Sequence, residues 1–78
     1  MRLNIISSEK VLFEGEADAV TLPGELGSFT VLRNHASLIS SLVAGKIFYK
    51  DASGEQHEIG IKGGVADVDK NVISVCVY

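Results

Sequence analysis

Residues 22–38 read LPGELGSFTVLRNHASL, a stretch in which turn-forming residues alternate with short apolar runs. Proline fixes φ, glycine accepts positive φ and asparagine bonds to its own backbone, so Pro23-Gly24 and Arg33-Asn34 are predicted as turns. The run Phe29–Leu32 between them has the length and composition of a β-strand. Residues 36–42 are predicted as a further strand or as a tight helical turn. Short runs between turns are typical of an all-β domain.

The same pattern continues on the N-terminal side of this stretch. Leu3 and Ile5 alternate with polar residues, which predicts a strand that ends at a turn over residues 7–9. A second apolar run covers residues 11–22. Gly15 lies inside this run, where a glycine is expected to produce a bend or a bulge.

On the C-terminal side, further strands are predicted over residues 46–50, 56–61, 65–68 and 72–78. Turns are predicted between them at residues 51–54, 63–64 and 69–71. Gly54 is placed to take positive φ, and Asn71 tolerates the left-handed conformation. In the last strand the apolar side chains share one face: Ile73, Val75 and Val77.

Together these elements predict an all-β fold, a flattened barrel or β-sandwich of about eight to ten short, mostly antiparallel strands. The chain has 78 residues, and we expect residues 1–78 to form one domain because chains shorter than about 100 residues rarely divide. The apolar fraction of 46% is sufficient for a folded core.

Composition argues against several classes of function. The net charge is −3 and the Lys and Arg residues are scattered, which argues against a nucleic-acid-binding face. The N-terminus lacks the apolar run of about 7–15 residues of a signal peptide, and no segment approaches the roughly 20 apolar residues that span a bilayer. We therefore expect a soluble chain that meets a membrane only through a partner. The single cysteine, Cys76, favours a reducing compartment.

Residues that catalyse reactions or bind metals are few and dispersed. His35 and His57 lie in separate predicted elements, and adjacent residues such as His57 and Glu58 point to opposite faces of a strand. Cys76 is expected to pack inside its strand as a small apolar side chain, so a Cys76-dependent hydrolase is a remote alternative. Gly24 and the glycines near it lack the Lys-Ser/Thr of a phosphate loop. The sequence predicts no catalytic residues, no metal, no cofactor and no enzymatic activity.

One turn offers a different function. Asp69-Lys70 lies at the tip of a predicted hairpin, which resembles the acylated lysine of lipoyl carrier domains. In those domains the lysine lies between two similar halves, whereas Lys70 is close to the end of this chain. A solvated turn lysine is the simpler interpretation. A carrier domain modified at Lys70 and an unrelated β-sandwich interaction module are kept as alternatives.

The stretch 22–38 resembles the signature of the ε subunit of F-type ATP synthases. In that family a glycine-rich turn leads to Gly-Ile/Val-Leu-Pro-x-His-Ala-Pro-Leu, and the order of residues is similar here. The flanks agree in order and spacing, since residues 3–7 and 13–15 resemble the family's opening. Residues 42–47 resemble its Leu-x-x-Gly-x-Ile, and residues 63–68 its Gly-Gly-Phe/Ile-x-x-Val. The resemblance covers essentially the whole chain.

The resemblance implies a noncatalytic rotor subunit that binds the central γ stalk and the c ring, and that couples proton-driven rotation to ATP synthesis. It also implies a peripheral position on the cytoplasmic face of the bacterial inner membrane. Family members usually continue into two antiparallel C-terminal helices. The 78 residues are therefore expected to be a short form without this helical hairpin or an excised domain.

By position in the motif, the resemblance implies two contact surfaces. The c ring is expected to meet Glu25, Leu26, Gly27, Ser28 and Phe29, and the γ subunit to meet Ser7, His35 and Ser40. Two of these residues have an alternative structural role. His35 could be a buried histidine that forms a hydrogen bond across its loop, and Phe29 could be an aromatic residue of the core.

Three positions depart from the family pattern. Thr30 replaces a glycine, while Arg33 and Ser37 replace two prolines. Because proline restricts the unfolded chain, its loss is expected to leave the loop around His35 less constrained.

Overall fold

The computed structural model describes residues 1–78 as eight β-strands without a helix. The strands are β1 (Arg2–Ser7), β2 (Val11–Gly24), β3 (Gly27–Leu32), β4 (Leu38–Leu42), β5 (Gly45–Asp51), β6 (Gln56–Ile61), β7 (Gly64–Asp69) and β8 (Val72–Val77). Residues 36–42, predicted as a strand or a helical turn, therefore contain a strand. The structure has no helix long and apolar enough to cross a membrane.

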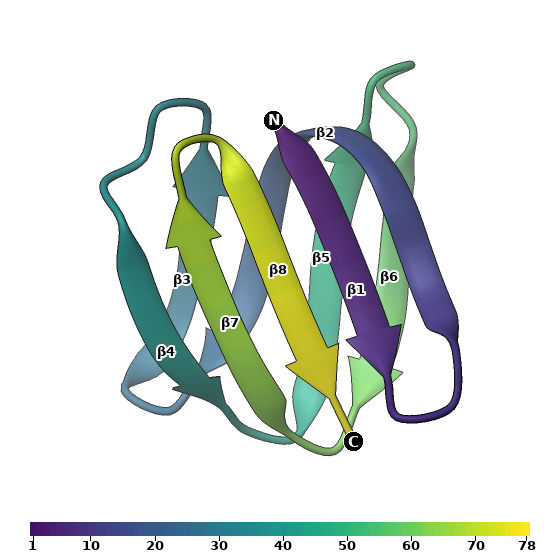
Figure 1. Ribbon diagram of the computed structural model, residues 1–78, viewed down its shortest axis with the longest axis vertical. Coiled ribbons are helices and arrows are strands. Elements are labelled where there is room, and N and C mark those ends of the chain that lie inside the picture. Colours follow the sequence, from purple (N-terminus) through teal and green to yellow (C-terminus); the bar gives the residue numbers. More distant parts are fainter.

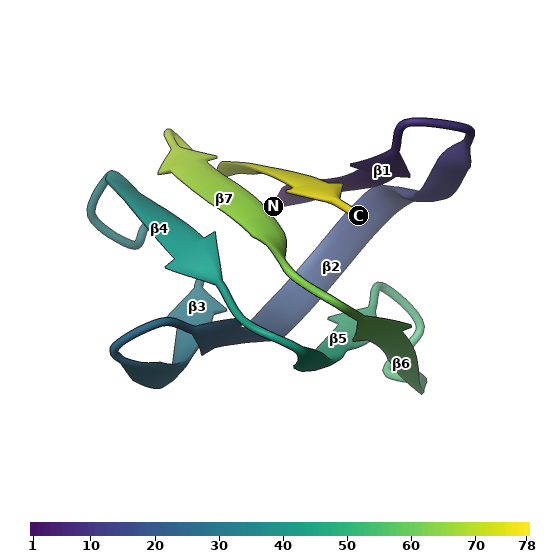
Figure 2. The same ribbon diagram turned by 90° about the horizontal axis from the view of Figure 1, so that it is seen from below.

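The strands form two layers that face each other. One layer contains β4, β7, β8 and β1, and the other contains β3, β2, β5 and β6 (Figure 1). Strand β2 is 14 residues long and belongs to both layers: residues 11–16 pair with β1, and residues 17–24 pair with β3 and β5. Figure 2 shows it crossing obliquely from one layer to the other. All strand pairs are antiparallel except β1–β8, which confirms the predicted sandwich of mostly antiparallel strands.

The core lies between the layers and is entirely apolar. Strand β8 follows the predicted alternation, with Ile73, Val75 and Val77 buried. Side chains from both layers complete the core, and the largest that are fully buried are Leu3, Ile5, Leu22, Ile47, Ile73, Val20, Val31, Val68 and Val75. Period-two alternation thus places one face of each strand in this core and the other in solvent.

One prediction about a single residue was wrong, and another is excluded only in part. Gly15 is not a bulge, because it pairs regularly with Leu3 and the register shifts fall elsewhere, although β2 itself curves where it passes between the layers (Figure 1). The Phe13 ring covers Gly15: a Cβ atom at Gly15 would lie 3.1 Å from Phe13 Cζ. Cys76 is not packed in the core but is exposed, because it lies on the outer face of β8.

The turns take the predicted conformations. Gly54 has a φ of 88°, and Asn71 has a φ of 63°. Lys70 precedes Asn71 and is also left-handed, with a φ of 48°. Gly27, in the β2–β3 turn, has a φ of 128°, a value that residues with a Cβ atom rarely adopt.

Candidate functional site

The β2–β3 turn is an exposed tip of the molecule, at the bottom left of Figure 1. Glu25 to Ser28 are all exposed, and Leu26 is fully solvated with a relative exposure of 103%. The turn is nevertheless held in place, because the Glu25 N–H donates a hydrogen bond of 2.9 Å to the Ser41 carbonyl of β4. The five residues predicted to meet the c ring therefore form one anchored tip with an apolar apex.

Phe29 differs from the rest of that tip. It is half-buried and packs against the core, as in the alternative structural role for this residue. Its ring also fills the space at Gly24, where a Cβ atom would lie 2.8 Å from Phe29 Cδ1. Phe29 thus fixes the base of the turn, while Leu26 and Ser28 form its accessible part.

An open groove continues from the turn along the edge of the sandwich. It has a volume of about 410 Å³ and is lined by Leu26, Gly27, Ser28, Phe29, Leu38, Ile39 and Ser40. The groove exists because β3 and β4, which are edge strands of opposite layers at the left of Figure 1, do not pair with each other. Ile39 is 75% exposed beside it. The groove provides an apolar surface next to the exposed tip.

The three residues predicted to meet the γ subunit are not brought together. Ser40 lies in β4 opposite Ala66, and its side chain faces the groove. Ser7 ends β1, and β8 and β7 separate β1 from β4, which corresponds to about 14 Å across the sheet. The Ser7 hydroxyl accepts hydrogen bonds from the N–H groups of Glu9 and Lys10, at 3.3 Å and 3.2 Å. Ser7 therefore has a clear local role as a turn residue.

His35 lies in the loop between β3 and β4 and is half-buried. Its Nδ1 atom lies 2.7 Å from the carbonyl oxygen of the adjacent Ala36, so it does not bridge the loop. His35 and Ser40 share the β4 edge of the molecule, whereas Ser7 does not.

The loop that carries His35 is anchored by contacts that the sequence did not reveal. The Asn34 N–H donates to Asn71 Oδ1 at 2.6 Å, and Asn71 Nδ2 donates to Asn34 Oδ1 at 2.9 Å. The Ser37 hydroxyl donates to Asp69 Oδ1 at 2.9 Å. These bonds connect the loop to the β7–β8 turn, so side-chain hydrogen bonds constrain a segment in which the family's prolines are replaced.

An apolar row crosses the outer face of the first layer. The strand register aligns Val65 of β7, Cys76 of β8, Ile6 of β1 and Val11 of β2, all of them exposed. The sequence analysis did not identify this row, because it depends on the register between strands, which a local pattern does not show. A row of this kind is suited to contact with another protein.

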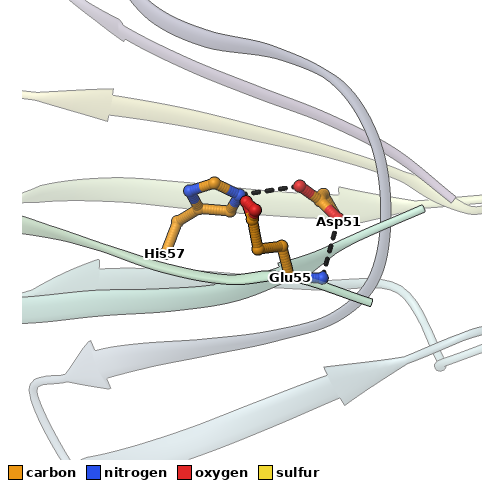
Figure 3. Close-up of side chains that lie close together, drawn as sticks. All are labelled: Asp51, Glu55 and His57. Carbon is orange, nitrogen blue, oxygen red and sulfur yellow. Dashed lines mark hydrogen bonds and ion pairs between the residues drawn. The ribbon is translucent and has the colours of Figure 1, made fainter. Parts of the chain in front are cut away.

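A separate cluster of polar side chains lies at the opposite end of the molecule, in the β5–β6 hairpin. Asp51, Glu55 and His57 place ligand atoms within 4.8 Å of one another (Figure 3). Hydrogen bonds from Ser53, then from His57 and Glu55, hold the pKa of the Asp51 carboxyl well below its usual range. Burial, with a smaller contribution from Asp51, raises the pKa of Tyr49.

The sequence predicted no metal site because His57 and Glu58 point to opposite faces, and Glu58 indeed pairs with Lys46 at 3.0 Å. The hairpin over residues 51–54 was predicted, but its consequence, that Asp51 and Glu55 lie beside His57, was not recognised.

Comparison with known proteins identifies a single family. The family model of the β-sandwich domain of the ATP synthase delta/epsilon chain matches residues 1–78. An ATP synthase epsilon chain of Xanthomonas campestris pv. campestris (strain B100) is 42% identical over 77 residues, and one of Xanthomonas oryzae pv. oryzae (strain MAFF 311018) is 39% identical. Each alignment covers 99% of this chain and 55% of the relative, so the chain spans about half the length of these relatives.

Two solved structures share the fold. A chain in the mitochondrial ATP synthase of Euglena gracilis (OSCP/F1/c-ring) superimposes with a TM-score of 0.89 at 22% identity, covering 96% of this chain and 48% of that chain. A chain in the central stalk/c-ring structure of Tetrahymena thermophila mitochondrial ATP synthase has a TM-score of 0.80 at 15% identity, covering 99% and 62%. Nothing in these comparisons favours a carrier domain or an unrelated interaction module. The chain belongs to the family of the ATP synthase delta/epsilon chain, of which it is the β-sandwich domain.

Proposed function

We propose that this chain is a rotor subunit of an F-type ATP synthase, in which it binds the γ subunit of the central stalk and the c ring and couples proton-driven rotation to ATP synthesis. The observation that carries this proposal is the family match over residues 1–78, together with relatives named ATP synthase epsilon chain. The similarity to chains in central-stalk and c-ring structures supports it.

The two proposed contacts use different parts of the sandwich. The c ring meets the tip formed by residues 25–29, where Leu26 offers an apolar apex and Ser28 a small polar surface. The γ subunit meets the β4 edge, where His35 and Ser40 lie, with Ser7 at the far margin of the same layer. A folded block of this kind binds at a small cost in ordering, because its backbone is fixed before the partners meet.

The chain has no catalytic part in this proposal. ATP chemistry takes place on other subunits, and the sandwich transmits motion between the ring and the stalk. Because the relatives are bacterial, its place is on the cytoplasmic face of the inner membrane, as a peripheral subunit held there by its partners.

Co-purification with the γ subunit and the c ring of the same synthase tests the proposal. We compare the native chain with His35→Ala, Ser28→Asp and, as a control at the other end of the molecule, Lys50→Ala. The native chain and Lys50→Ala should retain both partners. Ser28→Asp should lose the c ring while it retains γ, and His35→Ala should weaken the capture of γ. A folded native chain that fails to bind γ would contradict the proposed role as a rotor subunit.

A further inference from the structure

The β5–β6 hairpin brings together three side chains that can each donate one ligand atom to a metal ion. We infer that Asp51, Glu55 and His57 form a binding site for a divalent transition metal, for which zinc is the probe. Their ligand atoms all lie within 4.8 Å of one another although the residues span only one turn of the chain. In Figure 3 the carboxylates of Asp51 and Glu55 both lie at the same ring nitrogen of His57.

The distances suit a small ion. His57 Nε2 and Asp51 Oδ2 are 2.7 Å apart. Zinc binds nitrogen and oxygen ligands at about 2.0–2.2 Å in a tetrahedral arrangement, which places neighbouring ligand atoms about 3.3–3.5 Å apart. The pair of His57 and Asp51 must therefore open slightly and Glu55 must move inwards. Glu55 is exposed and Asp51 and His57 are half-buried, so both movements take place at the surface of the hairpin.

The hairpin orients Asp51 and His57 through contacts to Asp51 Oδ1 and to the face of the His57 ring. The two ligand atoms, Asp51 Oδ2 and His57 Nε2, are bonded to each other, and a metal ion would take the place of the proton between them. Asp51 Oδ1 accepts hydrogen bonds from the Ser53 N–H at 3.0 Å, the Ser53 hydroxyl at 2.7 Å and the Glu55 N–H at 3.0 Å, which leaves Oδ2 directed at His57. The His57 ring stacks on Tyr49 with centroids 5.0 Å apart. Outer contacts of this kind orient metal ligands and strengthen metal binding.

A simple ion pair between Asp51 and His57 explains only part of this arrangement. The Glu55 carboxylate makes no hydrogen bond or ion pair within the chain, yet it lies beside a second carboxylate. Two like charges at this distance oppose each other, and a divalent cation between them would remove that repulsion. Imidazole combined with carboxylates favours zinc and related transition metals over magnesium or calcium, which prefer oxygen ligands alone.

Calorimetric titration of the full chain with zinc chloride tests the inference. All variants carry Cys76→Ser, because the exposed Cys76 thiol is a competing zinc ligand. Glu55→Gln removes one ligand and keeps the backbone N–H that bonds to Asp51. Glu58→Gln removes the same charge from the same hairpin but lies on the opposite face, paired with Lys46. His57→Gln removes the nitrogen ligand.

We expect one zinc ion per chain. Glu55→Gln and His57→Gln should each weaken zinc binding by at least about tenfold, since even a change outside the ligand set can cause a loss of this size. Glu58→Gln should bind zinc as tightly as the chain that carries Cys76→Ser alone. Zinc should also shift the imidazole ¹⁵N resonances of His57 and leave those of His35 unchanged. The inference is overturned if the folded chain binds no zinc at millimolar concentration, or if Glu55→Gln and Glu58→Gln bind it equally well. Glu55→Gln decides the question even if His57→Gln unfolds.

Discussion

Among single residues, Asp51 stabilises the β5–β6 hairpin as an ionised carboxylate. Hydrogen bonds from Ser53, His57 and Glu55 lower its pKa in the folded chain from the usual 3.8. A carboxyl whose pKa is lower in the folded state adds stability above its unfolded pKa, and that stability is lost as the pH falls towards the folded pKa. The contribution of Asp51 is therefore complete at neutral pH and declines once the pH drops below about 4.

We expect Asp51→Asn to be less stable than the native chain at neutral pH, and the difference to shrink as the pH falls below about 4. Urea unfolding followed by circular dichroism, with EDTA present, measures the free energy of unfolding at each pH. Asp67→Asn, on the outer face of β7, removes the same charge without these hydrogen bonds and serves as the control. Parallel stability curves for Asp51→Asn and the native chain would contradict the assignment.

Asn71 combines two roles that different substitutions can separate. It adopts a φ of 63° and its side chain exchanges two hydrogen bonds with Asn34. Asn71→Gly keeps the backbone conformation and loses the hydrogen bonds, at a cost of about 1–2 kcal/mol. Asn71→Ala also introduces left-handed strain and should cost about 1 kcal/mol more. Chemical denaturation ranks the variants, and amide exchange at the Asn34 N–H should accelerate in both. Equal stability of the Gly and Ala variants would show that strain is unimportant here.

Among the strands, β7 depends on a glycine at its first residue. A Cβ atom at Gly64 would overlap the Cys76 carbonyl oxygen and lie 3.0 Å from Val77 Cα, so β7 could not approach β8 as it does. Gly64→Ala should therefore destabilise the chain by about 1–3 kcal/mol. Gly60→Ala is the matched control, because nothing lies within 4 Å of its Cβ position in β6. Thermal unfolding compares the two, and similar midpoints would contradict the steric argument.

The strands themselves were largely predictable, because alternation is a local property. The β8 residues Ile73 and Val75 show it clearly, and β8 was predicted with the correct buried face. The bulge expected at Gly15 is absent, and the Phe13 ring that covers Gly15 is a contact that the sequence pattern does not place. The choice between strand and helical turn at 36–42 was open because alternation is weak around two adjacent serines.

The contacts between strands were less predictable than the strands. The parallel pairing of β1 with β8 joins the two ends of the chain, and no local pattern encodes it. For the same reason the Asn34–Asn71 bonds were not foreseen, although both residues were recognised as turn formers. The turn predicted at Pro23-Gly24 lies two residues later, because these two residues still pair with β3. The groove beside the turn depends on which strands fail to pair.

For the whole molecule, one core shared by two layers predicts a single cooperative transition. Ile5 in β1 and Ile47 in β5 lie in different layers, and both are completely buried. Ile→Val at either position should cost about 0.5–1.5 kcal/mol. Each variant should lower the denaturation midpoint without changing the slope of the transition, since the same surface is exposed on unfolding. A second transition, or a slope altered in only one variant, would mean that the layers unfold separately.

The passage of β2 through both layers has a mechanical consequence. Two stacked sheets joined only by side chains can slide past each other under load, whereas here one continuous backbone is hydrogen-bonded into both. A twisting force applied to the tip at residues 25–29 reaches β1 along covalent bonds, and shear between the layers would first have to break the ladders on either half of β2. We therefore expect the domain to resist twisting as one body, with no slip between its layers.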